Sequence, residues 1–273
     1  MSLNSVNTNR QAVFALQSLN QTNADLGLVQ KRVSTGFRVA DARDDGGAYA
    51  VAQAVRSDIA GVTAVNEQLG GVKGVLQTTF AALTVVSDTM KQARAVLTRL
   101  ADGNIDSTQR AQYDTQFAQL KTQITGFIND ATYNGRTLLS TATGSGGNIV
   151  GIRNESGGTF TITAEDGAAL QITATPSDAQ SAVTLLNGGF ITVETAIGRA
   201  LNKFGASMQF VENQITYNVK KNDALNDGLG ALVDADLAKE SSNLQALQTR
   251  QQLGVQTLSL ANQGPQVLLS LFR

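Results

Sequence analysis

The sequence has no cysteine, no histidine and no tryptophan, and only 2 prolines among its 273 residues. Without cysteine there is no disulfide framework, thiolate nucleophile or zinc finger. Without histidine there is no imidazole base and no Ser-His-Asp arrangement. An enzyme would therefore need a carboxylate pair, a lysine Schiff base or an oxygen-ligated metal. These absences predict a protein that is not an enzyme and that uses no cofactor and no metal.

The charges of the chain are nearly balanced, with 21 basic and 22 acidic residues and a net charge of −1. No basic run marks a surface for nucleic acid or an anionic membrane. Residues 1–17 lack the continuous apolar segment of a signal peptide, and no stretch approaches the roughly 18 apolar residues of a membrane span. We therefore expect a soluble protein outside the Sec route, with no membrane insertion. Its near-neutral surface permits self-association.

Apolar residues recur at helical spacing at both ends of the chain, where they form two narrow seams. The first seam, in which Thr22 fills a gap, consists of Ala12, Ala15, Leu19, Leu26, Val29 and Val33. The last seam, which Gln251 and Gly254 interrupt, consists of Leu237, Leu244, Leu247, Leu258, Ala261 and Leu268. Such narrow stripes bury too little surface to hold an isolated helix in water. Each end therefore needs a partner, either the other end or another copy of the chain.

Longer helical patterns lie between these seams. One runs from near Ser57 to Leu100, which corresponds to roughly 60 Å of helix. Asp106 or Ser107 can cap a following helix. Helical spacing resumes after Pro176 and breaks at residues 226–230, which contain two glycines.

The middle of the chain, residues 140–175, is rich in glycine, serine and threonine. Short alternating runs at residues 148–153, 159–164 and 170–175 are separated by turn-forming residues, which predicts a small set of β-hairpins. The predicted fold class is therefore mainly α, with long helices, a terminal coiled coil formed by the N- and C-terminal segments, and a small β-hairpin region in the middle.

Three local motifs have simple structural interpretations. Asp41, Asp44 and Asp45 lack the ligand spacing of a calcium loop and are expected to form a polar connector. Residues 234–236, Asp-Ala-Asp, are expected to place carboxylates at a helix N-terminus. Residues 70–71, Gly-Gly, lack phosphate-loop spacing and are expected to allow tight helix packing.

Several ordered motifs at the two ends resemble bacterial flagellin. In the N-terminal half these are Asn7-Thr8-Asn9, residues 31–39 (KRVSTGFRV), residues 42–45 (ARDD) and residues 132–139 (TYNGRTLL). In the C-terminal part they are residues 234–240 (DADLAKE), 251–254 (QQLG) and 261–271 (ANQGPQVLLSL). The motifs occur in the family's order and at the family's distances from both termini, and they cover roughly the first 140 and the last 85 residues.

The resemblance implies a subunit that polymerises into the flagellar filament outside the cell and serves motility. It implies a terminal coiled-coil core domain of residues 1–42 and 234–273, a helical rod domain of residues 43–139 and 176–233, and a short variable β-rich insert of residues 140–175. The implied partners are copies of itself, the hook-filament junction and cap proteins, and an export chaperone. Flagellins leave the cell as unfolded chains through the flagellar type III apparatus.

The resemblance also assigns residue roles. The two terminal seams become the self-assembly contact of the innermost filament layer, and we expect them to be largely disordered in the free subunit because they lack partners there. Arg32, Gly36, Asp44 and Asp45 become the connector between the terminal helix and the rod.

One position departs from the family pattern. Many flagellins carry an Arg followed by Glu on the first rod helix, within a surface that innate immune receptors recognise. Here Arg94 is followed by Ala95, and Gln92 stands where a second Arg is usual. This degenerate receptor surface implies weak or absent receptor activation.

Two alternatives remain at the level of sequence. A hook-filament junction protein shares the terminal pattern, although the complete C-terminal match favours the filament subunit. A cell-surface flagellin homologue could instead bind polysaccharide through the β-rich insert. Phe160 is the one aromatic residue in the predicted hairpins, whereas sugar sites generally use aromatic faces.

Overall fold

The structure is a computed structural model that describes residues 9–140 and 146–270, the last seven of them as backbone only. The chain forms two compact units, residues 1–57 with 224–273 and residues 58–223. Two helices, α2 and α5, contribute to both units. The helices are α1 (Arg10–Thr35), α2 (Gly46–Leu100), α3 (Ser107–Asp130), η1 (Gly167–Leu170), α4 (Ala179–Asn187), α5 (Gly189–Val233) and α6 (Leu237–Ser270), and the strands are β1 (Ile149–Ile152) and β2 (Thr159–Ile162).

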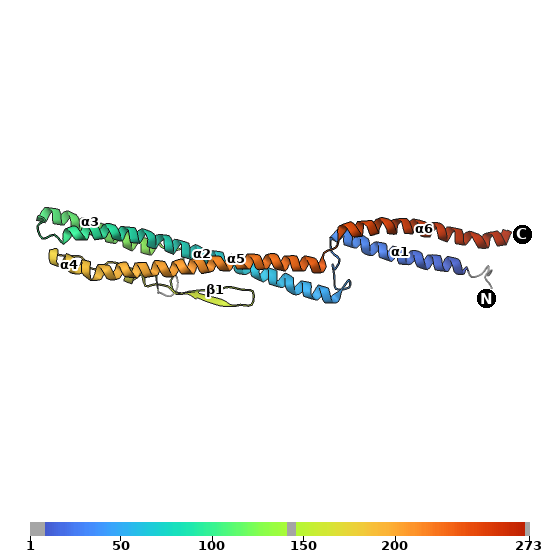
Figure 1. Cartoon of the computed structure of the whole chain (residues 1–273), viewed down its shortest axis with the longest axis horizontal. Coiled ribbons are helices and arrows are strands. Elements are labelled where there is room, and N and C mark those ends of the chain that lie inside the picture. The colour runs from blue at the N-terminus through green and yellow to red at the C-terminus, as the bar shows by residue number, and fades with distance from the viewer. Residues whose placement is uncertain (1–8, 141–145, 271–273) are drawn as a thin grey trace. The chain divides into compact units, whose positions relative to one another are not determined.

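In the first unit, α1 and α6 lie side by side and run antiparallel (Figure 1). The side chain of Asn9 caps α1 by accepting a hydrogen bond from the amide of Ala12. Gly36 ends α1 in the left-handed conformation, with φ of 75°, and donates its amide hydrogen to the carbonyl of Arg32. The predicted terminal pairing is confirmed, and within one chain the partner of each end is the other end.

Both long helices extend beyond their predicted bounds. α2 begins at Gly46 and not near Ser57, and α5 continues through residues 226–230, where a break was predicted. The reason is tertiary packing, because buried Ala52 of α2 and buried Val233 of α5 form a small core with Val39. Burial of these helix ends offsets the roughly 1 kcal/mol by which each glycine disfavours a helix interior.

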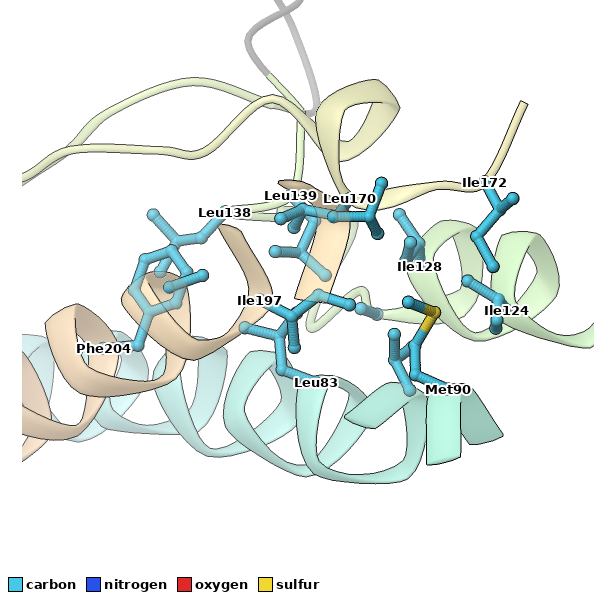
Figure 2. Close-up of a cluster of buried hydrophobic side chains, with 14 of the residues drawn as sticks. Leu83, Met90, Ile124, Ile128, Leu138, Leu139, Leu170, Ile172, Ile197 and Phe204 are labelled. Carbon is cyan, nitrogen blue, oxygen red and sulfur yellow. The ribbon is translucent and has the colours of Figure 1, made fainter. Parts of the chain in front are cut away.

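The second unit is built around a continuous apolar core between α2, α3 and α5. Leu83 and Met90 of α2 face Ile124 of α3 and Ile197 of α5, and all four side chains are buried (Figure 2). Leu138, Leu139, Leu170 and Ile172, from the segment between α3 and α4, close the core on one side. The predicted cap of α3 is confirmed, since Asp106 accepts hydrogen bonds from the amides of Thr108 and Gln109.

The described residues in the middle of the chain form one β-hairpin where several were predicted. β1 and β2 pair antiparallel with Ile149 opposite Ile162. The run at residues 170–175 forms no strand, because Leu170 ends the 3₁₀-helix η1 and turns into the core together with Ile172. Its alternation arises from burial of two apolar side chains on a helical core and not from sheet pairing.

By length and composition alone, α2 is long enough and apolar enough to cross a membrane. The core helices of soluble proteins have the same length and composition, and Leu69, Leu76 and Leu83 of α2 are completely buried in the core of the second unit. We therefore interpret α2 as a core helix.

Candidate assembly interface

The contact between α1 and α6 has a small apolar centre. Leu26, Val29 and Leu247 are buried there, and Val33 and Leu244 pack against them half-buried. These five residues all belong to the seams predicted from sequence. A fully buried leucine stabilises a structure by only about 1.5–3 kcal/mol. This centre therefore stabilises the pairing of two helices of 26 and 34 residues only weakly.

The remaining seam residues contribute less. Thr22 is buried and donates its hydroxyl to the carbonyl of Ser18, which satisfies the polar group within α1. Leu237 is 49% exposed and does not belong to the buried centre, and the side chain of Leu268 falls outside the described residues. The half-buried members are Ala12, Ala15, Leu19, Leu258 and Ala261.

Polar contacts join the two helices along their length, and sequence analysis did not predict them. Nη1 of Arg32 lies 3.2 Å from Oε1 of Glu240, which is buried. Gln251 donates a hydrogen bond of 2.7 Å to Oδ1 of Asn23, and Asn9 donates one of 2.7 Å to the carbonyl of Ala261. The interruption of the last seam by Gln251 was the available signal for such a contact.

The same two helices leave large apolar side chains exposed to solvent. Phe14 of α1 is 65% exposed and Leu260 of α6 is 72% exposed. Val13, Leu16, Leu253 and Val255 are exposed as well. Large apolar side chains that a helix pair leaves exposed indicate a surface that meets another protein.

The connector after α1 is held by charged side chains. Nζ of Lys31 lies 2.9 Å from Oδ2 of Asp41 and 2.8 Å from Oδ2 of Asp44. The same Asp44 oxygen accepts the amide hydrogens of Ala40 and Asp41. The hydrogen bond from Lys31 lowers the pKa of Asp44, and those from Arg43 and Lys31 lower the pKa of Asp41. The two carboxylates are therefore held in the charged form.

The connector residues predicted from the family resemblance all have structural contacts. Gly36 accepts the amide hydrogen of Ala235, next to α6, and Asp45 caps α2 by accepting the amide hydrogen of Ala48. Arg32 and Asp44 make the ion pairs described above. Their role as a connector between the terminal helix and the rod stays a prediction, and no group of three or more potential metal ligands occurs in the described part of the chain.

Two other predicted sites can be placed. Asp236 accepts the amide hydrogens of Ala238 and Lys239 at the start of α6, as a helix N-terminal carboxylate should. On α2, Gln92, Arg94 and Ala95 are exposed, and Nη1 of Arg94 lies 3.0 Å from Oε2 of Glu194 on α5.

Comparison with known proteins identifies the family. The family model of the bacterial flagellin N-terminal helical region matches residues 6–143, and that of the C-terminal helical region matches residues 192–272. The chain belongs to the bacterial flagellin family. Flagellin FljM of Caulobacter vibrioides is 36% identical, with both chains covered completely. The flagellin of Brucella melitensis is 33% identical, with 98% of this chain and 99% of the relative covered.

Solved structures agree with this assignment. The crystal structure of Bacillus cereus flagellin is similar with a TM-score of 0.51 and 25% identity, and it covers 56% of this flagellin and 88% of that chain. A Vibrio parahaemolyticus structure described as a flagellar hook-associated protein shares the fold alone, with a TM-score of 0.58 and 12% identity over 70% of this chain and all of that chain. As a flagellin, the protein is a structural subunit that polymerises into the flagellar filament.

Proposed function

We propose that the α1–α6 pair is the part of this flagellin that drives polymerisation and forms the innermost filament layer. The observation that carries this is the exposure of Phe14 and Leu260, together with further apolar side chains, on a helix pair that buries only three apolar side chains among those the structure describes. Contact with other copies would bury these side chains at about 25 cal/mol per Å². A weak pair in the free subunit then becomes an ordered layer in the filament.

The rest of the chain takes the roles that the family resemblance implies. In this proposal residues 1–42 and 234–273 form the terminal core domain, residues 43–139 and 176–233 form the rod, and residues 140–175 form the variable insert. The self-assembly contact consists of the two terminal seams.

The export route and the partners other than copies of the chain are also proposals. We propose that the chain leaves the cell unfolded through the flagellar type III apparatus with an export chaperone and that it meets junction and cap proteins at the filament ends. The absence of cysteine supports this, because such a chain cannot form disulfides during transit.

The assembly role is tested by changing the exposed apolar residues. Phe14→Ser combined with Leu260→Ser should abolish filament growth from seeded fragments, as seen by electron microscopy and sedimentation, while the helix content of the free subunit is retained. The matched control is Gln17→Ser at an exposed polar position of α1, which should grow normally. Removal of residues 234–273 should also abolish growth, and filaments formed by either the double variant or the truncated chain would refute the proposal.

A further inference from the structure

The exposed apolar side chains of the α1–α6 pair lie on two different flanks. The first flank contains a groove of about 410 Å³. The residues that line this groove include Phe14, Ser18, Gln21 and Asp25 of α1 and Arg250 of α6. Leu253 and Leu260, which are 56% and 72% exposed, follow Arg250 by 3 and 10 residues and so lie on the same side of α6. Phe14, Leu253 and Leu260 are therefore the apolar residues of the first flank.

The second flank lies on the opposite side of the contact between the two helices. An α-helix turns by about 100° per residue, so Leu16 lies about 200° from Phe14 around α1, and the buried Leu26 lies between them. On α6, Val255 lies about 140° from the side that faces the groove, and the buried Leu247 lies between the two sides. Leu16 is 47% exposed and Val255 is 53% exposed.

The second flank is a single surface made by both helices. The helices run antiparallel, and a Cβ built on Gly254 lies 3.2 Å from Cδ1 of Leu19. Val255 of α6 is therefore nearly level with Leu16 of α1. The two residues form the apolar part of the second flank, as the residues around the groove form that of the first.

The two flanks differ in composition. The first flank places the ring of Phe14 beside polar groups, which include the guanidinium of Arg250 and the carboxylate of Asp25. The second flank presents two aliphatic side chains. An apolar centre inside a polar rim is the usual composition of a contact between proteins, and aliphatic side chains can fill such a centre.

Growth into a filament restricts how these flanks can meet. A flank that meets the same flank of another copy across a two-fold axis closes a dimer and leaves the other flank exposed. Covering both flanks in this way would need two separate self-complementary surfaces. A first flank that meets a second flank is a heterologous contact, which adds each copy by the same operation and continues as a helical filament unless the rotation closes a ring. One pair of matching surfaces then covers both flanks of every copy.

We propose that neighbouring copies of this flagellin meet by a heterologous contact in which the first flank of one α1–α6 pair receives Leu16 and Val255 of the next pair. The inference rests on the proposed assembly role of the pair, and it adds which two surfaces meet. Both flanks become buried when a copy joins the filament, whereas a free subunit exposes both.

Charge exchange between the flanks of the full-length chain tests this contact. The first-flank chain carries Leu253→Glu and Leu260→Glu, and the second-flank chain carries Leu16→Lys and Val255→Lys. The opposite-charge chain combines all four substitutions. Two like-charge controls carry lysine at all four positions or glutamate at all four positions. All four positions are exposed in the free subunit, so circular dichroism should show the same helix content in every chain.

The rate of filament growth from seeds, followed by sedimentation and electron microscopy at low salt, is the measured quantity. The first-flank and second-flank chains should each grow at least about tenfold more slowly than the parent when each is added to its own seeds, because a charge enters an apolar contact. The opposite-charge chain should grow at least about fivefold faster than either of them, because glutamate then meets lysine. High salt should reduce this recovery. Both like-charge controls should remain slow.

Two results would overturn the heterologous contact. The first is an opposite-charge chain that grows no faster than the chains with one altered flank. The second is a like-charge control that recovers as much as the opposite-charge chain, because the recovery would then not depend on which flanks meet.

Failure of the heterologous contact can be distinguished from failure of the assembly role. If the first-flank and second-flank chains both grow as fast as the parent, the assembly role of the α1–α6 surface fails, and this inference fails with it. If Phe14→Ser with Leu260→Ser stops growth while Leu16→Lys with Val255→Lys does not, the assembly role stands and only the inference about the second flank fails.

Discussion

At the scale of single residues, one polar side chain fixes a turn of the backbone, and one glycine allows a close contact. Asp44 accepts two backbone amide hydrogens and an ammonium group, and so fixes the turn that follows α1. Gly74 lies against the ring of Tyr133, and a Cβ built there would approach that ring to 2.6 Å. Gly70 and Gly71 have no atom within 4 Å of a built Cβ, so the prediction that they allow tight packing is wrong.

Acid should loosen the connector. The pKa values of Asp41 and Asp44 are lowered in the folded chain, so their contribution is fully present above about pH 4, the ordinary aspartate value, and is lost as the pH falls through the lowered values. Hydrogen-exchange protection of the Ala40 and Asp41 amides should therefore be constant from pH 7 to about pH 5 and fall at lower pH. Asp44→Asn should reduce this protection already at pH 7. Equal protection in the parent and the variant would contradict the role of Asp44.

Alanine at Gly74 should destabilise the second unit. The new methyl group displaces the ring of Tyr133, and overpacking of this kind costs about 1–3 kcal/mol. The matched control is Gly70→Ala on the same helix, which meets nothing and should stabilise by about 0.5–1 kcal/mol. Urea unfolding of the two variants measures the difference in their free energies of unfolding. Equal midpoints would show that the contact with Tyr133 does not affect stability.

At the scale of elements, tertiary contacts determine how long each helix is. α5 spans 45 residues and passes through a segment with two glycines. Its last turns are retained because Leu229 and Leu232 pack on the small core around Val39 and Val233. The hairpin is likewise held by helix contacts, since Nζ of Lys221 pairs with Glu155 in its turn at 2.5 Å.

Gly228→Ala should stabilise α5 by about 0.5–1 kcal/mol, because a Cβ there meets no atom within 4 Å and alanine is the better helix former. Gly230→Ala is the matched control. A Cβ at Gly230 lies 2.8 Å from Oδ2 of Asp234, so the gain should be offset by displacement of that carboxylate. Thermal unfolding should give a higher Tm for the first variant than for the second, and the opposite order would show that α5 is strained at Gly228.

At the scale of the whole molecule, segments far apart in sequence share each unit. Residues near both ends form the first unit, and the second unit contains the core of α2, α3 and α5 together with the hairpin. The described residues of the proposed insert, residues 140–175, form one hairpin and a 3₁₀-helix, and a segment of this length is too short for a large outer domain. We therefore expect a thin-walled filament.

The filament should activate innate immune receptors weakly or not at all. The exposed guanidinium of Arg94 is paired with Glu194, and Gln92 and Ala95 replace the charged residues usual in the family pattern. A cell-based receptor assay on purified monomer should show little response at concentrations where a flagellin with the full pattern saturates. Gln92→Arg combined with Ala95→Glu should raise the response, and a full response from the unmodified protein would refute the prediction.

The sequence was sufficient for the features that depend on local spacing and on motifs. Helical periodicity identified the terminal seams around Leu26 and Leu247, and Asp106 marked a helix boundary by its capping chemistry. The ordered terminal motifs identified the family. These features are readable because a helix repeats every 3.6 residues and because caps require particular side chains.

The features that sequence analysis missed depend on contacts between distant residues. α5 continues through Gly228 because Val233 is buried against Val39, and residues 170–175 form no strand because Leu170 and Ile172 enter a helical core. The pairing of Arg32 with Glu240 joins residues 208 positions apart, and nothing in the spacing of either segment indicates it. Local pattern thus determined which segments are helical, whereas tertiary packing decided where the helices end and in which register they meet, because burial of distant side chains outweighs the small local preferences of single residues.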